Sequence, residues 1–273
     1  MDFSVLISVY KNDDPVHFDE AISSISSGQS LAPSEIVLVV DGPVSRGLND
    51  VITKWEQQQE FPFVVVRSDE NIGLANALNL GLSHCRFEYV ARMDSDDVSL
   101  QSRFERQIEY LSKHPNVALL GSWYQQFDMS LQQLLNDRKV PAANDKILSY
   151  ARMRTPFNHV TAIFRKSKVL EVGGYPDIRG FMEDWWLGLR LIKANYELAN
   201  LPEYLVHVRG DKQFIGRRGG LTYLKHELVN LKQMHREQLM GTFDLMRNML
   251  LRSTVRLIPN TARSLLYKAI RKF

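Results

Sequence analysis

Three carboxylates stand within the four residues 94–97, whose sequence is Asp-Ser-Asp-Asp. The apolar residues 89–93 lead into them as a strand would, and residues 100–112 have helical spacing behind Ser99 as a helix cap. Carboxylates this close repel one another, and a hard divalent cation, Mg²⁺ or Mn²⁺, relieves that repulsion while keeping positions open for phosphate oxygens. The stretch therefore predicts a metal site for a nucleoside diphosphate. The alternative is a solvated acidic loop that caps the next helix.

A second acidic pair, Glu183 and Asp184, begins another helical pattern and is followed directly by Trp185 and Trp186. Acidic residues are favoured in the first turn of a helix by its dipole, which is the plain structural interpretation of the pair. The two adjacent indoles argue against a turn that is simply exposed to solvent. The pair is therefore a second candidate for chemistry.

The elements that must position these residues alternate in type over the first hundred residues. Four apolar segments have the composition of strands, and helical patterns separate them. The four segments are residues 4–10, 35–41, 63–67 and 89–93. This alternation predicts an α/β fold built on a mostly parallel, right-handed open sheet. Asp41 ends the second strand and is followed by Gly42-Pro43, at the sheet edge where such folds bind ligands.

Beyond Pro115 the alternation ends and the pattern becomes mixed. Strands are expected at residues 117–127, 160–165 and 203–208, and helices at 145–153, from 181, and from 221 to 273 with breaks near Gly241 and Pro259. We therefore expect a catalytic domain over residues 1–210, with a nucleotide-binding half (1–100) and an acceptor half (101–210). Residues 211–273 would form a basic helical extension.

Composition bounds the class of protein. With 273 residues, 44% hydrophobic and 24% charged, the chain suits one large domain or one domain with an appendage. A single cysteine, Cys85, excludes a disulfide framework and a cysteine-rich zinc site, which favours a reducing compartment. The first residues lack the basic region of a signal peptide, and no segment reaches the length of a transmembrane helix. A membrane-spanning protein is not expected.

The net charge of +3 conceals an asymmetry. Residues 212–273 carry 13 Lys+Arg against 3 Asp+Glu, whereas residues 1–211 carry 21 against 28. The C-terminal quarter, at +10, is suited to an anionic surface, and the remainder, at −7, is not suited to nucleic acid.

Five segments taken together resemble the family 2 inverting glycosyltransferases, which have the GT-A fold. They are Val5-Leu-Ile-Ser-Val-Tyr10, Val39-Val40-Asp41-Gly42, Asn71-x-Gly73-Leu-Ala, Met93-Asp94-x-Asp96-Asp97 and Glu183-Asp184. The resemblance covers residues 3 to about 210. Three further segments are similar to the subgroup that builds bacterial surface polysaccharides such as O-antigen and capsule. They are Asn158-His159-x-Thr161-x-x-Phe164-Arg165-Lys166-Ser167, Arg217-Arg218-Gly219-Gly220 and the basic tail around Leu257-Ile-Pro259.

The resemblance implies roles for particular residues. Asp96 would hold the metal, Asp94 would lie at the ribose, and Asp184 would be the general base. Glu183 would bind the acceptor or orient the loop. The nucleotide-sugar site as a whole would comprise Val9, Tyr10, Asp41, Asn71, Gly73, Asp94 and Ser95. Family members often have an acid two residues after the base, where this chain has Trp186.

The resemblance also implies a reaction. Asp184 would deprotonate an acceptor hydroxyl that attacks the anomeric carbon opposite the leaving group, so that one metal-assisted displacement inverts that centre. The donor would be a UDP-sugar carrying galactose, glucose or an N-acetylhexosamine. The acceptor would be a saccharide linked to a polyprenyl diphosphate, at the cytoplasmic face of the bacterial membrane.

Other polar or aromatic residues are candidates for contacts with acceptor or phosphate. His159 could touch acceptor phosphate or be a satisfied structural histidine. Trp185 and Trp186 could stack on an acceptor sugar or pack in the core. The remaining candidates are His207 and Arg209, at the end of the last predicted strand, and Arg217 and Arg218, on a glycine-flanked loop that would close over diphosphate or lie in solvent.

The tail carries the signature of a peripheral membrane helix. Residues 245–273 contain seven Lys+Arg and no acidic residue. On a helical wheel one side is apolar and the rest is basic. The apolar residues are Ala262, Leu266, Ala269, Ile270 and Phe273, and the basic ones are Arg263, Lys268, Arg271 and Lys272. The sequence predicts a helix lying in the plane of an anionic membrane. The alternative is that the stripe packs on the catalytic domain.

Two other functions compete. In a haloacid-dehalogenase-type phosphatase Asp94 would be the nucleophile, and Val98 fits that motif, but Asp41 and the pair Glu183-Asp184 would then have no role. A non-enzymatic module that binds a membrane surface or nucleic acid through the basic tail is the second rival. A pyrophosphorylase lacks support because no glycine-rich phosphate loop occurs near the N-terminus.

Overall fold

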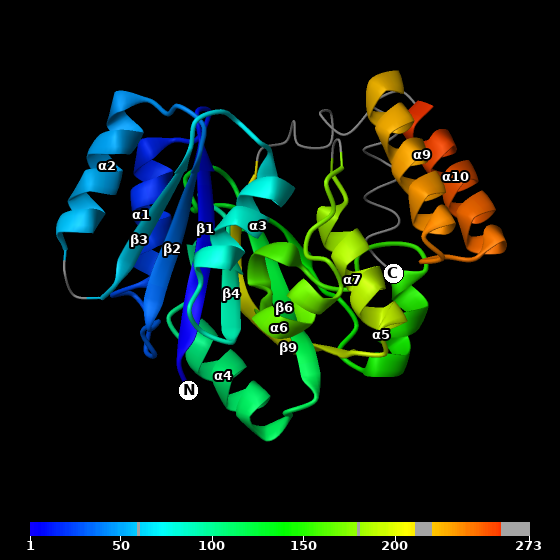
Figure 1. Cartoon of the computed structure of the whole chain (residues 1–273), viewed down its shortest axis with the longest axis horizontal. Helices are drawn as coiled ribbons and strands as arrows, with labels where there is room; N and C mark the ends of the chain where they lie inside the picture. Colours follow the sequence, from blue (N-terminus) through cyan, green and yellow to red (C-terminus); the bar gives the residue numbers. More distant parts are fainter. Residues whose placement is uncertain (59–60, 179–180, 211–219, 258–273) are drawn as a thin grey trace.

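The computed structural model describes residues 1–58, 61–178, 181–210 and 220–257. The strands in those residues form one open sheet with helices on both faces (Figure 1). The strands are β1 (Phe3–Tyr10), β2 (Glu35–Asp41), β3 (Phe63–Ser68), β4 (Tyr89–Met93), β5 (Val98–Ser99), β6 (Val117–Phe127), β7 (Leu134–Arg138), β8 (Ile163–Arg165) and β9 (Glu197–Arg209). The helices are α1 (Pro15–Ile25), α2 (Arg46–Gln57), α3 (Leu74–His84), α4 (Arg103–Lys113), α5 (Asn144–Ala151), η1 (His159–Thr161), α6 (Lys166–Glu171), α7 (Glu183–Lys193), α9 (Leu221–Arg236) and α10 (Thr242–Leu257).

The sheet has the strand order β3-β2-β1-β4-β8-β6-β9-β5, with β7 paired to β6. The first four strands are mutually parallel, which confirms the interpretation of the alternating pattern. The second half is mixed, because β8 runs antiparallel to both β4 and β6 while β9 runs parallel to β6. The sequence pattern predicted that the regular alternation of strands and helices ends after Pro115, which the mixed second half confirms. It did not predict the short elements β7 and α6.

The parallel strands are apolar throughout because both faces of the sheet are covered. On β1, Val5, Ile7 and Val9 pack in one cluster with α1, α2 and α4. Leu6, which points the other way, packs in a second cluster with α3 and α7. Consecutive side chains of a strand alternate between faces, so one strand contributes to both cores.

Local capping explains where some helices begin. The Asp14 carboxylate accepts hydrogen bonds from the backbone N–H groups of Val16 and His17 at the start of α1 (2.8 and 3.2 Å). The expectation that Ser99 caps a helix from residue 100 is wrong, because Ser99 belongs to β5 and α4 begins at Arg103. Tertiary contacts keep Ser99 extended: it pairs with β9, and its N–H donates to Ser24 Oγ at 3.0 Å.

The carboxyl ends of the parallel strands meet at one edge. Tyr10 pairs with Asp41, and Ile7 pairs with Met93, the residue just before the acidic stretch. The residues predicted to bind a nucleotide and a metal therefore leave the sheet side by side, as such folds require.

The helical pattern from Leu221 is confirmed as far as Leu257, with the predicted break at Gly241, whereas the break at Pro259 and the tail beyond it lie outside the described residues. Helices α9 and α10 form a hairpin at the end of the molecule opposite α1 and α2 (Figure 1). A third core cluster joins α9 to α5 and α7. Across the portion of the chain with described placement, every helix is too short or too polar to traverse a bilayer.

Candidate functional site

A cavity of about 240 Å³ lies beside the acidic turn that follows β4. Its walls combine the acidic residues with side chains from β6, β7, β9 and α7, elements that are far apart in the sequence. The lining residues are Asp94, Asp96, Asp97, Tyr124, Arg138, Thr155, Phe157, Asn158, His159, Val160, Asp184, Val208 and Arg209. The two acidic motifs recognised in the sequence thus face one cavity.

The three carboxylates of the turn have different surroundings. Asp97 is buried, and its Oδ1 accepts a hydrogen bond from the backbone N–H of Arg209 at 2.9 Å. Burial, and then the charges of Asp96 and Asp94, raise the pKa of Asp97 well above its usual value. Asp97 therefore joins the turn to the end of β9, and Asp94 and Asp96 remain as the oxygen donors on the wall of the cavity.

Asp94 forms an ion pair with Arg92, a side chain that is only 3% exposed. Arg103, also buried, donates from Nη2 to the backbone oxygen of Arg92 at 2.7 Å. Arg92 is an ordinary strand residue in the sequence pattern, and its role was not predicted. The signal that could have indicated it is a cation in an otherwise apolar, fully buried strand, since such a charge needs a partner.

The donors at the turn suit a hard cation. Partial withdrawal from solvent, and then the Asp94 charge, raise the pKa of Asp96, so a bound cation would relieve a repulsion that the fold maintains. Among the residues with described positions, no three or more His, Cys, Asp or Glu side chains converge as a complete metal site. Mg²⁺ characteristically takes one or two carboxylates and completes its shell with water and substrate phosphates, which fits this arrangement.

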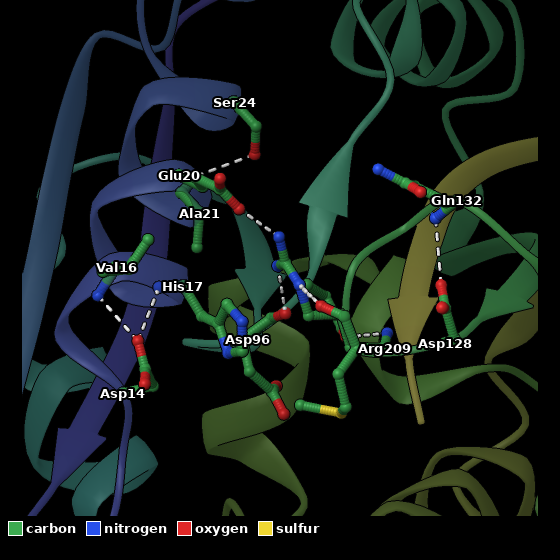
Figure 2. A network of polar contacts seen from close by, with 12 residues as sticks. Asp14, Val16, His17, Glu20, Ala21, Ser24, Asp96, Asp128, Gln132 and Arg209 are labelled. Carbon is green, nitrogen blue, oxygen red and sulfur yellow. Dashed lines mark hydrogen bonds and ion pairs between the residues drawn. The ribbon is translucent and has the colours of Figure 1, made fainter. Parts of the chain in front are cut away.

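Arg209 connects the acidic turn to the first helix (Figure 2). Its guanidinium donates to the backbone oxygen of Asp96 at 2.6 Å and to that of Met129 at 3.2 Å, and it forms an ion pair with Glu20 of α1. Arg209 was predicted to lie near phosphate, and it does line the cavity. Its hydrogen bonds assign it the further task of holding the turn in place.

Asp13 is a site residue that the sequence analysis missed. Its Oδ2 accepts hydrogen bonds from Ser95 Oγ (2.8 Å) and from the backbone N–H of Tyr10 (3.0 Å). Burial raises the pKa of Asp13 to about 6, with smaller contributions from Asp96 and Asp94, against these hydrogen bonds, which lower it. An acid just beyond the end of β1, on the same sheet edge, was the signal that could have found it.

The predicted nucleotide-binding residues at the end of β2 and in the loop before α3 are hydrogen-bonded to one another. The Asp41 carboxylate accepts hydrogen bonds from the backbone N–H groups of Ile72 and Gly73 and from Asn71 Nδ2 (2.7, 3.1 and 2.9 Å). Gly42 has φ +83°, and a Cβ there would lie 2.7 Å from the Asn71 backbone nitrogen. Asp41 thus fixes the loop before α3, and its contact with a nucleotide stays a prediction.

Val9 and Tyr10 differ in what they can offer a ligand. Val9 is 1% exposed, belongs to the core and pairs with Val40 of β2, so its contact with a nucleotide stays a prediction. Tyr10 is 39% exposed at the open end of β1. An exposed ring at a strand end is suited to contact with a base.

Glu183 and Asp184 begin α7 but point to different places. Asp184 lines the cavity, and its Oδ1 accepts a hydrogen bond from the Trp185 N–H at 2.7 Å. Glu183 is buried, where burial and then the Asp184 charge raise its pKa to about 7. The preceding residue, Met182, has φ +117°, a left-handed conformation that is costly for a side chain of its kind. Strain of this sort is common where a chain must aim a functional group.

His159 lines the cavity, and both nitrogens of its ring lie near polar partners. Its Nε2 is 3.0 Å from the Tyr175 hydroxyl, and its Nδ1 is 3.8 Å from Glu183 Oε1. Burial, and then the charge of Arg92, hold the pKa of His159 well below its usual value. The imidazole is therefore neutral. Its hydrogen bond to Tyr175 agrees with the structural alternative, and contact with acceptor phosphate stays a prediction.

Trp185 and Trp186 are core residues, and the suggestion that they stack on an acceptor sugar is wrong. They are 2% and 0% exposed and pack with α5 and α9 in the third cluster. Trp185 Nε1 donates to the backbone oxygen of Ala151 at 2.7 Å, and Trp186 Nε1 donates to Glu237 Oε2 at 3.4 Å. Burying two indoles stabilises the junction that carries Asp184.

The remaining candidates lie away from the cavity or outside the described residues. The His207 ring packs against Phe127, with centroids 4.5 Å apart, and it is not among the cavity-lining residues of the described chain. Arg217 and Arg218 fall outside the described residues. Arg138, Tyr124 and Asn158 also line the cavity. Asn158 was recognised only as part of the motif with His159. Arg138 and Tyr124 were not predicted, because the sequence of a strand does not indicate which of its side chains will meet a site.

The chain is similar to known glycosyltransferases over almost its whole length. The family described as "Glycosyl transferase family 2" matches residues 4–174. The chain is 39% identical to the amylovoran biosynthesis glycosyltransferase AmsE of Erwinia amylovora, over 99% of each chain. It is 34% identical to the UDP-Gal:alpha-D-GlcNAc-diphosphoundecaprenol beta-1,3-galactosyltransferase of Escherichia coli, over 99% of this chain and 97% of that one.

Solved structures share the fold. The mannosyltransferase PcManGT of Pyrobaculum calidifontis, in complex with GDP-Man and Mn²⁺, has a TM-score of 0.64 at 15% identity, covering 99% of this chain and 80% of its own. S. aureus TarS 1–349 in complex with UDP-GlcNAc has a TM-score of 0.64 at 16% identity, covering 92% and 72%. The GT-A architecture expected from the sequence motifs is confirmed.

Proposed function

Since the chain belongs to glycosyltransferase family 2, we propose that it transfers a hexose, with inversion, from a UDP-sugar to a saccharide carried on a polyprenyl diphosphate. The observation that supports this most is the cavity in which Asp94 and Asp96 face Asp184, a residue about ninety positions further along the chain. One motif is suited to the donor diphosphate and the other to the acceptor hydroxyl. Family membership excludes a phosphatase that uses Asp94 and a non-enzymatic binding module.

Asp184 is the general base in this proposal. It takes the proton of the acceptor hydroxyl while that oxygen bonds to the anomeric carbon of the donor, on the face opposite the diphosphate. The bond from the anomeric carbon to the leaving oxygen breaks, and its electron pair departs with UDP. A single displacement of this kind inverts the anomeric centre. Glu183 stays out of the cavity and orients the start of α7.

Asp96, with Asp94 beside it, is the proposed site of Mn²⁺ or Mg²⁺. When bound, the cation supplies positive charge that offsets the charge developing on the diphosphate. Asp94 and Ser95 lie nearest the ribose, and Tyr10, Asp41, Asn71 and Gly73 frame the base side of the donor. Arg209 holds the turn through the Asp96 backbone oxygen.

The names of two relatives support the proposed substrates. The E. coli relative is a UDP-Gal enzyme whose acceptor is a diphosphoundecaprenol-linked GlcNAc, and the Erwinia relative serves amylovoran biosynthesis. We place the present protein in synthesis of a bacterial surface polysaccharide such as O-antigen, capsule or exopolysaccharide. Galactose, glucose and the N-acetylhexosamines are the sugars to test. The proposed location is the cytoplasmic face of the cell membrane, with the basic tail on anionic lipid.

Donor and stereochemistry can be tested in one experiment. Purified full-length protein would be supplied with a panel of UDP-sugars, Mn²⁺ or Mg²⁺, and a lipid-diphosphate-linked GlcNAc acceptor. We expect release of UDP with one donor above the rest, and a product whose new linkage has the configuration opposite to that of the donor. Retention of configuration would refute the single displacement. No transfer with any donor would refute the choice of acceptor or donor class.

A further inference from the structure

The cavity is lined by a second arginine besides Arg209, and it comes from a different strand. Arg138 ends β7 and pairs in register with Tyr124 of β6, which in turn pairs with Val206 of β9. Paired residues share a face of the sheet, and so does Val208, two positions beyond Val206. Arg138, Tyr124 and Val208 all line the cavity, so this face of the sheet forms one of its walls.

The two arginines of the cavity differ in what surrounds their charge. Arg209 is occupied by Glu20 and two backbone oxygens. Arg138 shares a hydrogen bond with Tyr124 but forms no ion pair within the part of the chain that the structure describes. Burial lowers the pKa of Arg138, but Tyr124, Tyr150 and Asp184 raise it above its usual value, so the side chain is charged. A charged guanidinium in a cavity, without an ion-pair partner among these residues, is suited to an anionic ligand.

The position of Arg138 indicates which anion that is. Two strand spacings, about 10 Å, separate β7 from β9, and the acidic turn lies beyond the end of β9. Asp184 is close enough for its charge to act on Arg138. Arg138 therefore lies near Asp184 and is separated from the acidic turn by the width of β6 and β9. The donor diphosphate belongs at the acidic turn, which leaves Arg138, near the proposed base, for the acceptor.

We propose that Arg138 binds the diphosphate of the acceptor, so that the sugar carrying the attacking hydroxyl is the sugar attached directly to that diphosphate. The inference rests on the proposed function and adds a substrate class to it: a lipid diphosphate bearing a single sugar. One ring bridges Asp184 and Arg138, with its hydroxyl at the carboxylate and its phosphates at the guanidinium. The planar fork of arginine matches two phosphate oxygens at once, which lysine does not.

The test compares acceptors that differ only in their anion. Wild-type protein, Arg138→Gln and Arg138→Lys would each receive the same sugar and lipid joined by a diphosphate or by a neutral glycosidic link. We expect Arg138→Gln to lose roughly 10- to 100-fold in kcat/KM for the diphosphate acceptor, mostly through KM, as for a lost hydrogen bond to a charged group. Its kcat/KM for the neutral acceptor and its KM for the donor should change little. The kcat/KM of Arg138→Lys for the diphosphate acceptor should lie between those of the wild type and Arg138→Gln.

Arg154→Gln is the matched control. Arg154 is an exposed cation near α5 whose guanidinium lies 5.2 Å from the Tyr150 ring centroid, and it does not line the cavity. This variant should keep the wild-type preference for the diphosphate acceptor. An equal loss of Arg138→Gln on both acceptors would overturn the proposal in favour of a structural role. A raised donor KM alone would place the donor diphosphate there instead.

Calorimetry separates this inference from the proposed function. A short-chain lipid diphosphate bearing GlcNAc should bind wild-type protein more tightly than Arg138→Gln by roughly 10-fold or more, whether or not transfer occurs. Equal dissociation constants would overturn the role of Arg138 and leave the transferase proposal standing. Unequal dissociation constants without transfer from any UDP-sugar would support the role of Arg138 and overturn the transferase proposal.

Discussion

At the scale of single residues, two adjacent carboxylates have opposite surroundings. Asp184 faces the cavity, whereas Glu183 is buried beside a neutral histidine. Asp184→Asn should therefore retain donor binding and lose transfer by roughly 10² to 10⁴, the usual scale of general-base catalysis. Steady-state kinetics with UDP binding measured in parallel tests this. Glu183→Gln is the control, and if it damages turnover more than Asp184→Asn, the base has been assigned to the wrong carboxylate.

Asp96 should be the residue through which a metal acts. Its carboxylate stands beside that of Asp94 on the cavity wall, and a cation relieves their repulsion. Asp96→Ala should lose most of its transfer activity, and added Mn²⁺ or Mg²⁺ should not restore it. The transfer activity of the wild-type protein should be lost in excess chelator and should return when the metal is added back. Normal turnover of Asp96→Ala in chelator would contradict the assignment.

The raised pKa of Glu183 should be visible as a dependence of stability on pH. Its pKa rises from a usual 4.5 to about 7, so between these values the folded state binds more protons than the unfolded state. The free energy of unfolding should therefore fall as pH rises through this window. Glu183→Gln keeps the shape and removes the charge. It should be more stable than wild type by about 1–3 kcal/mol at pH 8 and gain little at pH 4.5. Equal differences in urea unfolding at both pH values would contradict this.

At the scale of elements, Arg209 joins the end of β9 to the acidic turn and to α1 (Figure 2). Arg209→Gln should lower the free energy of unfolding by about 1–3 kcal/mol, because buried backbone acceptors lose a charged donor. It should also weaken UDP-sugar binding, since the turn loses its support. Arg106→Gln is the control: its pair with Glu203 is solvent-exposed and should contribute below about 1 kcal/mol. Equal losses in the two variants would show that Arg209 has no special role.

At the scale of the whole molecule, the α9–α10 hairpin has two apolar sides. Leu245 and Met249 of α10 pack in the third core cluster, while Phe243, Met246 and Leu250 are exposed at 77%, 65% and 70%. The inner side packs on the domain, whereas the apolar stripe for which membrane binding and core packing were the two interpretations, residues 262–273, lies outside the described residues. The outer side of α10 repeats at helical spacing, and contact of this side or of the tail with a membrane stays a prediction.

The structure also determines how membrane binding is to be tested. Full-length protein should sediment with anionic vesicles at low salt and be released at high salt, since each basic residue near the surface contributes about 1 kcal/mol. A chain ending at residue 257 keeps the packed helix α10, whose Asn248 bonds to the backbone oxygen of Arg152, and should lose most of the binding. Phe243→Ser with Met246→Ser should weaken what remains. Full-length protein left in the supernatant at low salt would disprove the membrane role.

Periodicity and composition were sufficient for the main elements of the nucleotide-binding half. The apolar runs of β1 to β4, the helices between them and the carboxylates at the end of β4 could all be predicted, because a strand covered on both faces leaves a local signature. The helix that begins at Glu183, α7, could also be predicted from the sequence. Family resemblance then supplied the fold that these parts form.

Tertiary structure decided everything that depends on which surfaces meet. Ser99 became a strand because β9 lies beside it, and Trp185 became core because α5 and α9 cover it. Asp13 and Arg138 joined the site because β1, β6 and β7 bring them to it. Local sequence records the faces of a helix or strand but not the partner that each face will meet. A residue's burial, its charge state and its place in a cavity are properties of that partner as much as of the residue itself.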